Sequence, residues 1–168
     1  ADDPVLLLIM GLGAQLLYWP DFFCKSLIDQ GFRVIRFDNR DIGLSSKIHH
    51  QGPPLSIVKL MGRFALGLEN QGAPYNLYDM ADDVALLIEK MQLGQVYVLG
   101  ASMGGMIAQI LAARYPEQVR ALGLLFSSNN QPLLPPPFPK QLFSLIARPK
   151  SDDEDAIIDH NLQIFKII

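Results

Sequence analysis

A serine stands among small residues in the segment VYVLGASMGG, residues 96–105. The centre of this segment, Gly-Ala-Ser-Met-Gly, matches the pattern Gly-x-Ser-x-Gly around Ser102. The pattern lets a serine occupy a sharp turn between a strand and a helix with its hydroxyl exposed. Glycines flank the turn because side chains two residues before and two after the serine would collide with the neighbouring strand and helix. The chemistry that this arrangement predicts is nucleophilic attack by the Ser102 hydroxyl on an acyl carbon.

Two backbone N–H groups are predicted to stabilise the oxyanion that such an attack creates. The helix expected after Ser102 begins at Met103, whose N–H has no acceptor inside the helix. The second donor is expected in the glycine-rich loop MGLG, residues 10–13, which follows another predicted strand. Within that loop Leu12 offers its N–H, and the glycines on either side leave the backbone room to approach a substrate. The sequence therefore predicts an oxyanion hole formed by the N–H groups of Leu12 and Met103.

Two other interpretations of the serine turn stay open. It is either a tight turn without chemistry or a turn that binds phosphate. The phosphate interpretation lacks the lysine of a P-loop and the Gly-x-Gly-x-x-Gly spacing of a dinucleotide-binding turn. The strand before Ser102, the helix after it and the glycine loop at a neighbouring strand end favour the nucleophile.

A reactive serine also needs a base, and in this arrangement the acid and the histidine follow the serine along the chain. The one histidine after Ser102 is His160. Five acids precede it closely: Asp152, Asp153, Glu154, Asp155 and Asp159. Ser151 and Glu154 have the spacing of a capping box, so we expect the acids to begin a helix and His160 to lie on its side. We therefore expect the acid and the histidine of the site beyond residue 168.

The elements that must position these residues alternate between strand and helix. Apolar runs predict strands over residues 4–11, 32–38, 95–100 and 120–128. Helical spacing and capping signals predict helices over residues 19–30, 76–93 and 103–114. Such alternation predicts an α/β fold: a parallel sheet with helices on both faces and the local strand order 2-1-3-4. The glycine loop and the serine turn then meet at the switch point of the sheet.

Four segments read LLIMGLGAQLLYWP, GFRVIRFDNRDIGLSS, YNLYDMADDVALLIEKM and VYVLGASMGGMIAQILAARYPEQVRALGLLFSS, and together run from about Pro4 to Ser128. They resemble the α/β-hydrolase family, in the bacterial serine-esterase branch that includes aclacinomycin methylesterase. The resemblance implies an α/β-hydrolase core with Ser102 as the nucleophile and the two N–H groups named above as the oxyanion hole. It also implies a lid that begins near Gln131.

The segment FDNRDIGLS matches the family's Asp-x-Arg-x-x-Gly-x-Ser loop, so the resemblance implies a structural rather than a catalytic role for Asp38 and Arg40. The glycine loop departs from the family, because Met10 stands where a histidine is common before the first glycine. The ring interactions of that histidine are therefore absent, whereas the backbone donor is unaffected by the change.

The chain is expected to divide into an α/β-hydrolase core, residues 1–130, and a proline-rich linker with the start of a helical lid, residues 131–168. The linker sequence NNQPLLPPPFPK is dense in proline and therefore stiff and extended. The apolar runs at both chain ends suggest a fragment that holds the nucleophile half of a larger enzyme. An apolar stripe at residues 55–68 is predicted to pack over the site or the core, with a membrane surface as the alternative.

Composition limits the partners of the protein. The 168 residues are 49% apolar and carry a net charge of −3 without a basic patch, which argues against nucleic acid as a partner. No signal peptide or spanning run is visible, so stable membrane insertion is not expected. The single cysteine, Cys24, cannot form an internal disulfide, which favours a cytoplasmic location. No cofactor is expected. A metal site is not expected either, because the dipole of the predicted helix explains the adjacent acids Asp82 and Asp83 near its start.

The leading hypothesis from the sequence is a serine hydrolase of carboxylic esters that forms an acyl-enzyme on Ser102, with methyl esters as the nearest substrates by resemblance. An apolar lid implies a small-molecule ester substrate that is apolar or bulky. The alternative is a truncated, non-catalytic hydrolase-fold module whose sheet edge and apolar C-terminus self-associate or bind a partner. A homo-oligomer is compatible with either hypothesis.

Overall fold

The computed structural model describes residues 3–48, 73–129, 131, 134, 151 and 153–165 of the chain. Its contacts divide the chain into two compact units. The first unit comprises residues 1–53 and 71–131, and the second comprises residues 54–70 and 132–168. The predicted apolar stripe and most of the predicted linker lie outside the described residues. The predicted division into a core and a lid at residue 130 stays a prediction.

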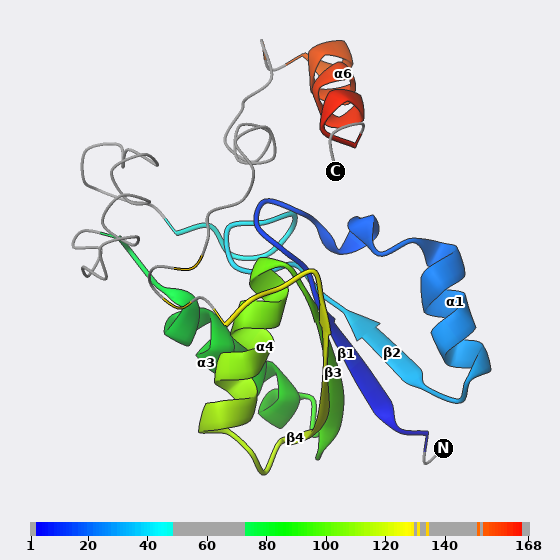
Figure 1. Ribbon diagram of the computed structural model, residues 1–168, viewed down its shortest axis with the longest axis vertical. Coiled ribbons are helices and arrows are strands. Elements are labelled where there is room, and N and C mark those ends of the chain that lie inside the picture. Colours follow the sequence, from blue (N-terminus) through cyan, green and yellow to red (C-terminus); the bar gives the residue numbers. More distant parts are fainter. Residues whose placement is uncertain are drawn as a thin grey trace. The chain divides into compact units, whose positions relative to one another are not determined.

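A parallel sheet of four strands forms the centre of the first unit (Figure 1). Its strands lie in the order β2 (Arg33–Arg36), β1 (Val5–Ile9), β3 (Val96–Ala101) and β4 (Val119–Leu125). This arrangement confirms the predicted order 2-1-3-4. All five residues of β1 are buried, because helices cover the sheet on both faces, as the unbroken apolar run of this strand predicted.

Helices lie on both faces of the sheet (Figure 1). The described helices of the first unit are a 3-10 helix, η1 (Leu16–Tyr18), and the α-helices α1 (Asp21–Asp29), α3 (Leu77–Lys90) and α4 (Met103–Arg114). α3 and α4 pack on one face through an apolar cluster that includes Leu7 of β1 and Ile107 of α4. α1 packs on the other face, where Leu8 of β1 and Cys24 share a second cluster. Cys24 is a buried residue of α1 and forms no disulfide.

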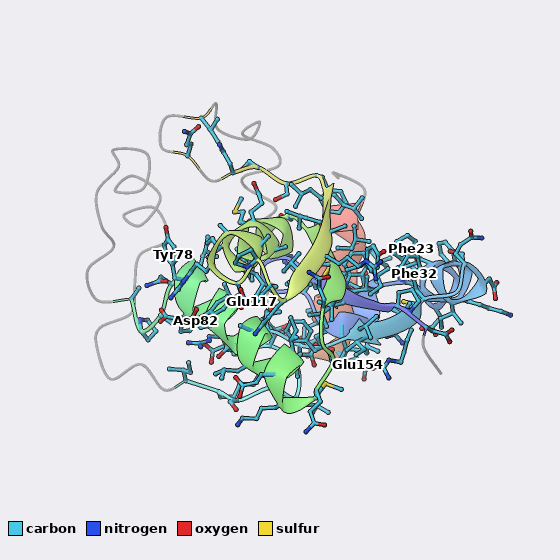
Figure 2. The ribbon with its side chains drawn as sticks, turned by 90° about the horizontal axis from the view of Figure 1, so that it is seen from below. Phe23, Phe32, Tyr78, Asp82, Glu117 and Glu154 are labelled. Atoms are coloured by element: carbon cyan, nitrogen blue, oxygen red, sulfur yellow. The ribbon has the colours of Figure 1, made fainter. Side chains whose placement is uncertain are left out.

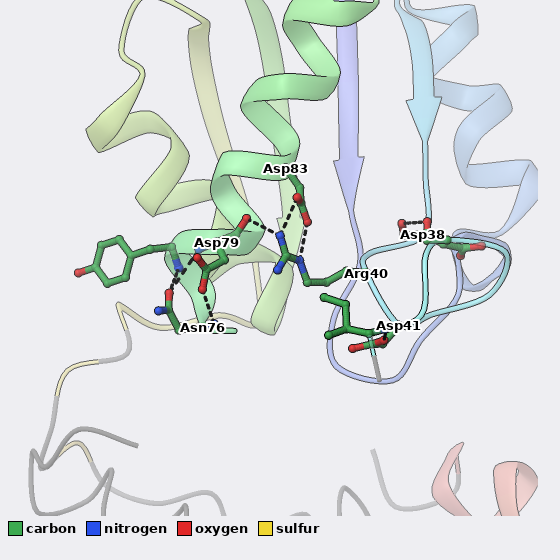
Figure 3. A network of polar contacts seen from close by, with 9 residues as sticks. Asp38, Arg40, Asp41, Asn76, Asp79 and Asp83 are labelled. Atoms are coloured by element: carbon green, nitrogen blue, oxygen red, sulfur yellow. Dashed lines mark hydrogen bonds and ion pairs between the residues drawn. The ribbon is translucent and has the colours of Figure 1, made fainter. Parts of the chain in front are cut away.

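The sequence signal for the start of α3 is confirmed. Asn76 precedes the helix, and its side-chain oxygen accepts the N–H groups of Tyr78 at 2.7 Å and of Asp79 at 3.3 Å. The Asp79 carboxylate in turn accepts the Asn76 N–H at 2.7 Å (Figure 3). This reciprocal capping box gives acceptors to N–H groups that the helix itself cannot satisfy.

The described helix of the second unit is α6 (Glu154–Phe165). The Asp153 carboxylate accepts the Ala156 N–H at 2.9 Å, so Asp153 caps this helix. The predicted capping box of Ser151 and Glu154 is therefore wrong: the Ser151 hydroxyl donates to the Asp153 carboxylate instead. His160 lies on α6 and is half-buried, as expected for a residue on the side of a helix.

An ion pair fastens the loop after β2, residues 38–48, to helix α3 (Figure 3). Arg40 donates from Nε and Nη2 to the two carboxylate oxygens of Asp83, at 2.6 and 2.7 Å. Nη2 also donates to the carbonyl oxygen of Asp79 at 3.1 Å, and the guanidinium lies 5.0 Å from the ring centre of Tyr75. The hydrogen bond with Asp83 raises the pKa of Arg40 above its usual value. The loop therefore has a fixed partner on α3.

The neighbouring acid, Asp82, joins α3 to α4. It accepts a hydrogen bond from the Tyr115 hydroxyl at 2.7 Å and pairs with Arg114 at 3.0 Å. Figure 2 shows Asp82 and Tyr78 together on α3, and the Arg114 guanidinium lies 5.7 Å from the ring centre of Tyr78. The helix dipole alone therefore does not account for the adjacent acids of α3, because each has a specific cationic or hydroxyl partner.

Helix α4 approaches β1 and β3 at a distance that excludes side chains. A Cβ atom added at Gly104 would lie 2.1 Å from the carbonyl oxygen of Ile9 in β1. A Cβ atom at Gly100 would lie 2.4 Å from the carbonyl oxygen of Gly104. Both distances are far inside the contact distance of carbon and oxygen, so the predicted need for small residues at these two positions is confirmed. Gly105, which the sequence analysis did not single out, is crowded too, because its Cβ would lie 2.4 Å from Ser127 Oγ.

Gly104→Ala is expected to lower the free energy of unfolding by about 1–3 kcal/mol or more, because the added methyl group meets backbone that cannot rotate away. Gly123→Ala is the matched control, since its Cβ meets first the end of a flexible side chain, Leu99 Cδ1, at 2.8 Å. The control should cost less than about 1 kcal/mol. Urea unfolding of both variants measures the difference. Equal losses of stability would show that the close approach of α4 to β1 does not specifically require glycine at position 104.

Asp83→Asn is expected to lower the free energy of unfolding by about 1 kcal/mol, because it weakens two charge-assisted hydrogen bonds of a half-exposed ion pair. Asp29→Asn is the control, since Asp29 ends α1 and has no ion pair among the described residues. Its expected effect lies within about 0.5 kcal/mol of zero. Thermal unfolding at neutral pH compares the two variants. A loss of stability in Asp29→Asn as large as in Asp83→Asn would contradict a specific stabilising role of the ion pair between Arg40 and Asp83.

Candidate active site

Ser102 occupies the turn between the end of β3 and the start of α4. Its backbone angles are φ 52° and ψ −121°, a region that residues other than glycine rarely adopt. Such a conformation costs roughly 1–3 kcal/mol and persists only where the surrounding structure fixes it. Backbone strain of this kind is typical of catalytic and ligand-binding residues. The serine that the sequence singled out is thus the strained residue of this turn.

Hydrogen bonds to neighbouring backbone and side-chain groups hold Ser102 in this conformation. Its N–H donates to the carbonyl oxygen of Leu125 in β4 at 3.0 Å. Its carbonyl oxygen accepts hydrogen bonds from the Ser127 hydroxyl at 2.7 Å and from the Gly105 N–H at 2.9 Å. The sequence analysis missed Ser127, because a serine just after a strand end has no distinctive pattern.

The glycine loop, residues 10–13, lies directly beside Ser102. Ile9, the last residue of β1, pairs with Gly100 of β3, so the next residues of the two strands continue side by side. A Cβ atom at Gly11 would lie 3.1 Å from Ser102 Cβ and 3.6 Å from the hydroxyl oxygen. The two loops that the sequence predicted to meet at the switch point are therefore in contact.

The glycine loop contains a turn that places Leu12 beside this contact. The Ala14 N–H donates to the Gly11 carbonyl oxygen at 3.4 Å, and Gly13 has a φ of +70°, in the left-handed region that favours glycine. The Leu12 side chain is 64% exposed. Met103 begins α4, where an N–H has no acceptor within the helix. Leu12 directly follows Gly11 and Met103 directly follows Ser102, so both predicted oxyanion donors are next in sequence to the two residues in contact. Their role as an oxyanion hole stays a prediction.

The loop after β2 holds both ends of the segment from Met10 to Leu16. Asn39 donates from Nδ2 to the Met10 carbonyl oxygen at 2.9 Å, and the Asp38 carboxylate accepts the Leu16 N–H at 2.7 Å. Asn39 is 4% exposed, and within the described ranges it is the one polar side chain classed with the buried core. Asp38 therefore makes structural contacts, as the resemblance implied. Asn39 was missed, because a single asparagine in a loop has no pattern that assigns it a partner.

The described residues of the first unit place no base next to Ser102. The first unit has no described histidine, and no hydrogen bond joins the Ser102 hydroxyl to another described side chain. His160 belongs to the second unit. The described residues contain no group of three side chains able to hold a metal ion. A serine without a base is a weak nucleophile, and the described part of the first unit supplies no histidine that could act as a base for Ser102.

None of the described helices is both long and apolar enough to cross a membrane. A hollow of about 300 Å³ lies at the loop after β2 and α3. It is lined by Phe37, Asp38, Asn39, Arg40, Ser45, Ser46, Ile48, Asp83 and Leu87. Ser102 does not line the hollow. The two charged residues Arg40 and Asp83 in its lining form an ion pair with each other (Figure 3). The hollow therefore adds no separate chemistry to the site.

Comparisons with known proteins agree with this geometry. Residues 4–162 match the family model described as the alpha/beta hydrolase fold. Rhodomycin D methylesterase DnrP from Streptomyces peucetius is 34% identical over 125 residues, which cover 74% of this chain and 35% of that protein. A poly(3-hydroxyalkanoate) depolymerase from Ectopseudomonas oleovorans is 31% identical over 131 residues, which cover 77% of this chain and 37% of that protein. The chain thus spans between 35% and 37% of the length of these two relatives.

Solved structures share the same fold. A hydrolase from Pseudomonas aeruginosa has a TM-score of 0.58 and 25% identity, over 89% of this chain and 47% of that one. The enol-lactonase from Burkholderia xenovorans LB400 has a TM-score of 0.61 at 20% identity, over 96% and 51%, and shows likeness of fold alone. With a strained serine turn at the switch point of a 2-1-3-4 sheet, the match over residues 4–162 shows that the chain belongs to the α/β-hydrolase family.

Proposed function

We propose that the complete protein is a serine hydrolase that cleaves carboxylic esters through an acyl-enzyme on Ser102. The observation that carries the proposal is the strained turn of Ser102, φ 52°, with Gly11 of the glycine loop packed against it. A strained serine at a strand end, beside backbone N–H donors, is the arrangement that acyl transfer requires. The 34% identical relative supports ester chemistry, since it is a methylesterase.

In the proposed reaction the Ser102 hydroxyl loses its proton to a base as its oxygen bonds to the carbonyl carbon of the ester. The electron pair of the C=O bond moves to the carbonyl oxygen, which the N–H groups of Leu12 and Met103 stabilise. Collapse of the tetrahedral intermediate breaks the ester C–O bond, and the alcohol leaves with the proton from the base. Water then attacks the acyl-enzyme by the same route and releases the carboxylic acid. The reaction needs no cofactor.

The acid and the histidine of this reaction are proposed to lie beyond Ile168. In this fold the order along the chain is serine, acid, histidine, with the last two on loops after later strands. The described part of the first unit offers no histidine to Ser102. The chain covers only 35% of the methylesterase, so the resemblance leaves room for both residues in the complete protein.

The proposed substrate is a small-molecule methyl ester with an apolar or bulky acyl part. The methyl ester follows from the resemblance to the methylesterase. The apolar acyl part follows from the composition of residues 131–168, which are proposed to form a linker and the start of a lid. An apolar lid favours apolar ligands because it removes their surface from water.

A non-catalytic module is the second candidate function, and the surface of β4 favours it. β4 lies at the edge of the described sheet, and Leu122, Leu124 and Phe126 are 37%, 43% and 83% exposed. Apolar side chains along a sheet edge favour pairing with another chain or segment. In that case the protein would self-associate or bind a partner without using Ser102.

A fluorophosphonate is expected to label the complete protein at Ser102, because such reagents phosphonylate an activated serine hydroxyl. Intact-protein mass spectrometry counts the adducts, and peptide mapping locates them. Ser102→Ala should abolish the adduct and lower ester hydrolysis by several powers of ten. Ser26→Ala should change neither, because Ser26 is an exposed residue of α1 that donates to the Phe23 carbonyl oxygen. A folded complete protein without label on Ser102 would refute the esterase proposal and leave the non-catalytic module.

The 168-residue chain by itself is expected to label several powers of ten more slowly than the complete protein, because the proposed base lies beyond Ile168. A time course followed by the same mass spectrometry compares the two. Labelling of the short chain at the full rate would contradict the placement of the base beyond Ile168. His160→Ala would then be the decisive variant, since His160 is the one histidine that follows Ser102 in this chain.

A further inference from the structure

Asn39 combines burial with a hydrogen bond directed at the backbone of the glycine loop. It is 4% exposed, and its Nδ2 donates to the carbonyl oxygen of Met10 at 2.9 Å. A buried amide bonded to a backbone carbonyl holds that carbonyl in one orientation, because breaking the bond leaves polar groups unsatisfied away from water. Met10 directly follows β1 and is the first residue of the glycine loop. Asn39 therefore holds the backbone at the position where the glycine loop leaves β1.

The same carbonyl oxygen also lies against the first turn of α4. A Cβ atom at Gly104 would be 2.7 Å from it. Gly104 directly follows Met103, whose N–H is one of the two proposed oxyanion donors. The other proposed donor, Leu12, stands two residues after Met10. The Met10 carbonyl oxygen thus lies between the Asn39 amide and the first turn of α4, the helix that begins with Met103. It also stands at the start of the glycine loop, which contains Leu12.

The glycine loop needs such an anchor because of its composition. Gly11 and Gly13 populate many backbone conformations, so the loop's own sequence does not fix the direction of the Leu12 N–H. The peptide group that joins Met10 to Gly11 is planar and rigid. Fixing the Met10 carbonyl oxygen therefore fixes the whole peptide group and limits the directions that the following Leu12 N–H can take.

We propose that Asn39 is a positioning residue of the oxyanion hole, which fixes the Leu12 N–H through the Met10 carbonyl without touching the substrate. The inference rests on the proposed function, since an oxyanion hole has a role only if Ser102 is acylated. Its expected signature is a loss of stabilisation of the charged oxygen with little change in the binding of the uncharged ligand. A donor misplaced by about 1 Å can cost roughly a hundredfold in rate.

The test uses the complete protein and the variant Asn39→Leu, which keeps the side-chain volume and removes the donor. A long-chain alkyl trifluoromethyl ketone adds to an active serine and places a negatively charged oxygen in the oxyanion hole. The secondary alcohol of the same chain length cannot form this adduct. The inhibition constant of each compound is measured against hydrolysis of a p-nitrophenyl ester, together with kcat and KM.

Asn39→Leu is expected to raise the inhibition constant of the ketone roughly tenfold to a hundredfold and to lower kcat by a similar factor. The inhibition constant of the alcohol and the KM should change by less than about threefold, because ground-state binding does not use the oxyanion hole. Asn39→Asp keeps the shape and turns a carboxylate toward the carbonyl, so it should give the same selective loss. Thermal unfolding checks that both variants fold.

Tyr115→Phe is the matched control. It also removes a side-chain hydrogen bond, that of the Tyr115 hydroxyl to Asp82 at 2.7 Å, but between α3 and α4. Both inhibition constants should stay within about twofold of their original values, because surface substitutions away from a site act mainly on stability. A selective loss in Tyr115→Phe equal to that in Asn39→Leu would overturn the inference, since it would show that any loosening of the fold has this effect.

Two further outcomes would overturn the inference and leave the proposed function intact. One is an equal rise of both inhibition constants in Asn39→Leu, or no rise for the ketone. The other is failure of both Asn39 variants to fold, which would assign Asn39 a purely structural role. An unaltered complete protein that neither hydrolyses the ester nor forms the ketone adduct would refute the proposed function itself, so the two failures are distinguishable.

Discussion

Ser102 keeps a φ of 52° because neighbouring segments leave its backbone no alternative. β4 accepts its N–H, and the Ser127 hydroxyl and the Gly105 N–H donate to its carbonyl oxygen. β3, α4 and the end of β1 approach one another closely enough to exclude side chains at the flanking glycines. Relaxation of any of these contacts would let the serine return to an ordinary conformation and withdraw its hydroxyl. The strain is therefore sustained by the packing of the whole sheet.

The site is assembled from stretches that are distant in sequence and adjacent only in the folded sheet. Parallel pairing of β1 with β3 brings the glycine loop against the serine turn. The loop after β2 then fixes that glycine loop through Asn39 and Asp38, and Arg40 in turn fastens the loop to α3. This chain of contacts links α3 and the loop after β2 to the glycine loop beside Ser102. In the proposed reaction, chemistry at Ser102 thus depends on residues that make no contact with the substrate.

Local patterns predicted the described strands, their order and the contact between the two loops, because apolar runs and helix caps are recognisable in a sequence. β1 is a continuous apolar run, and Asn76 carries a capping signal that competes with no other residue nearby. Long-range polar pairs leave no such mark: Asn39 bonds a carbonyl 29 positions away, and Ser127 bonds one 25 positions away. At α6 the predicted cap, Ser151, is wrong, because the Asp153 carboxylate directly precedes the helix and accepts the Ala156 N–H.

A crystal structure of the complete protein with a trifluoromethyl ketone bound would locate the charged oxygen itself and so decide whether Leu12 and Met103 form an oxyanion hole beside Ser102. We expect a covalent bond to Ser102 Oγ, with the oxygen about 2.7–3.1 Å from the backbone nitrogens of both Leu12 and Met103. The Ser102 φ should stay positive. An adduct on another residue, or an oxygen held by neither N–H group, would contradict the account.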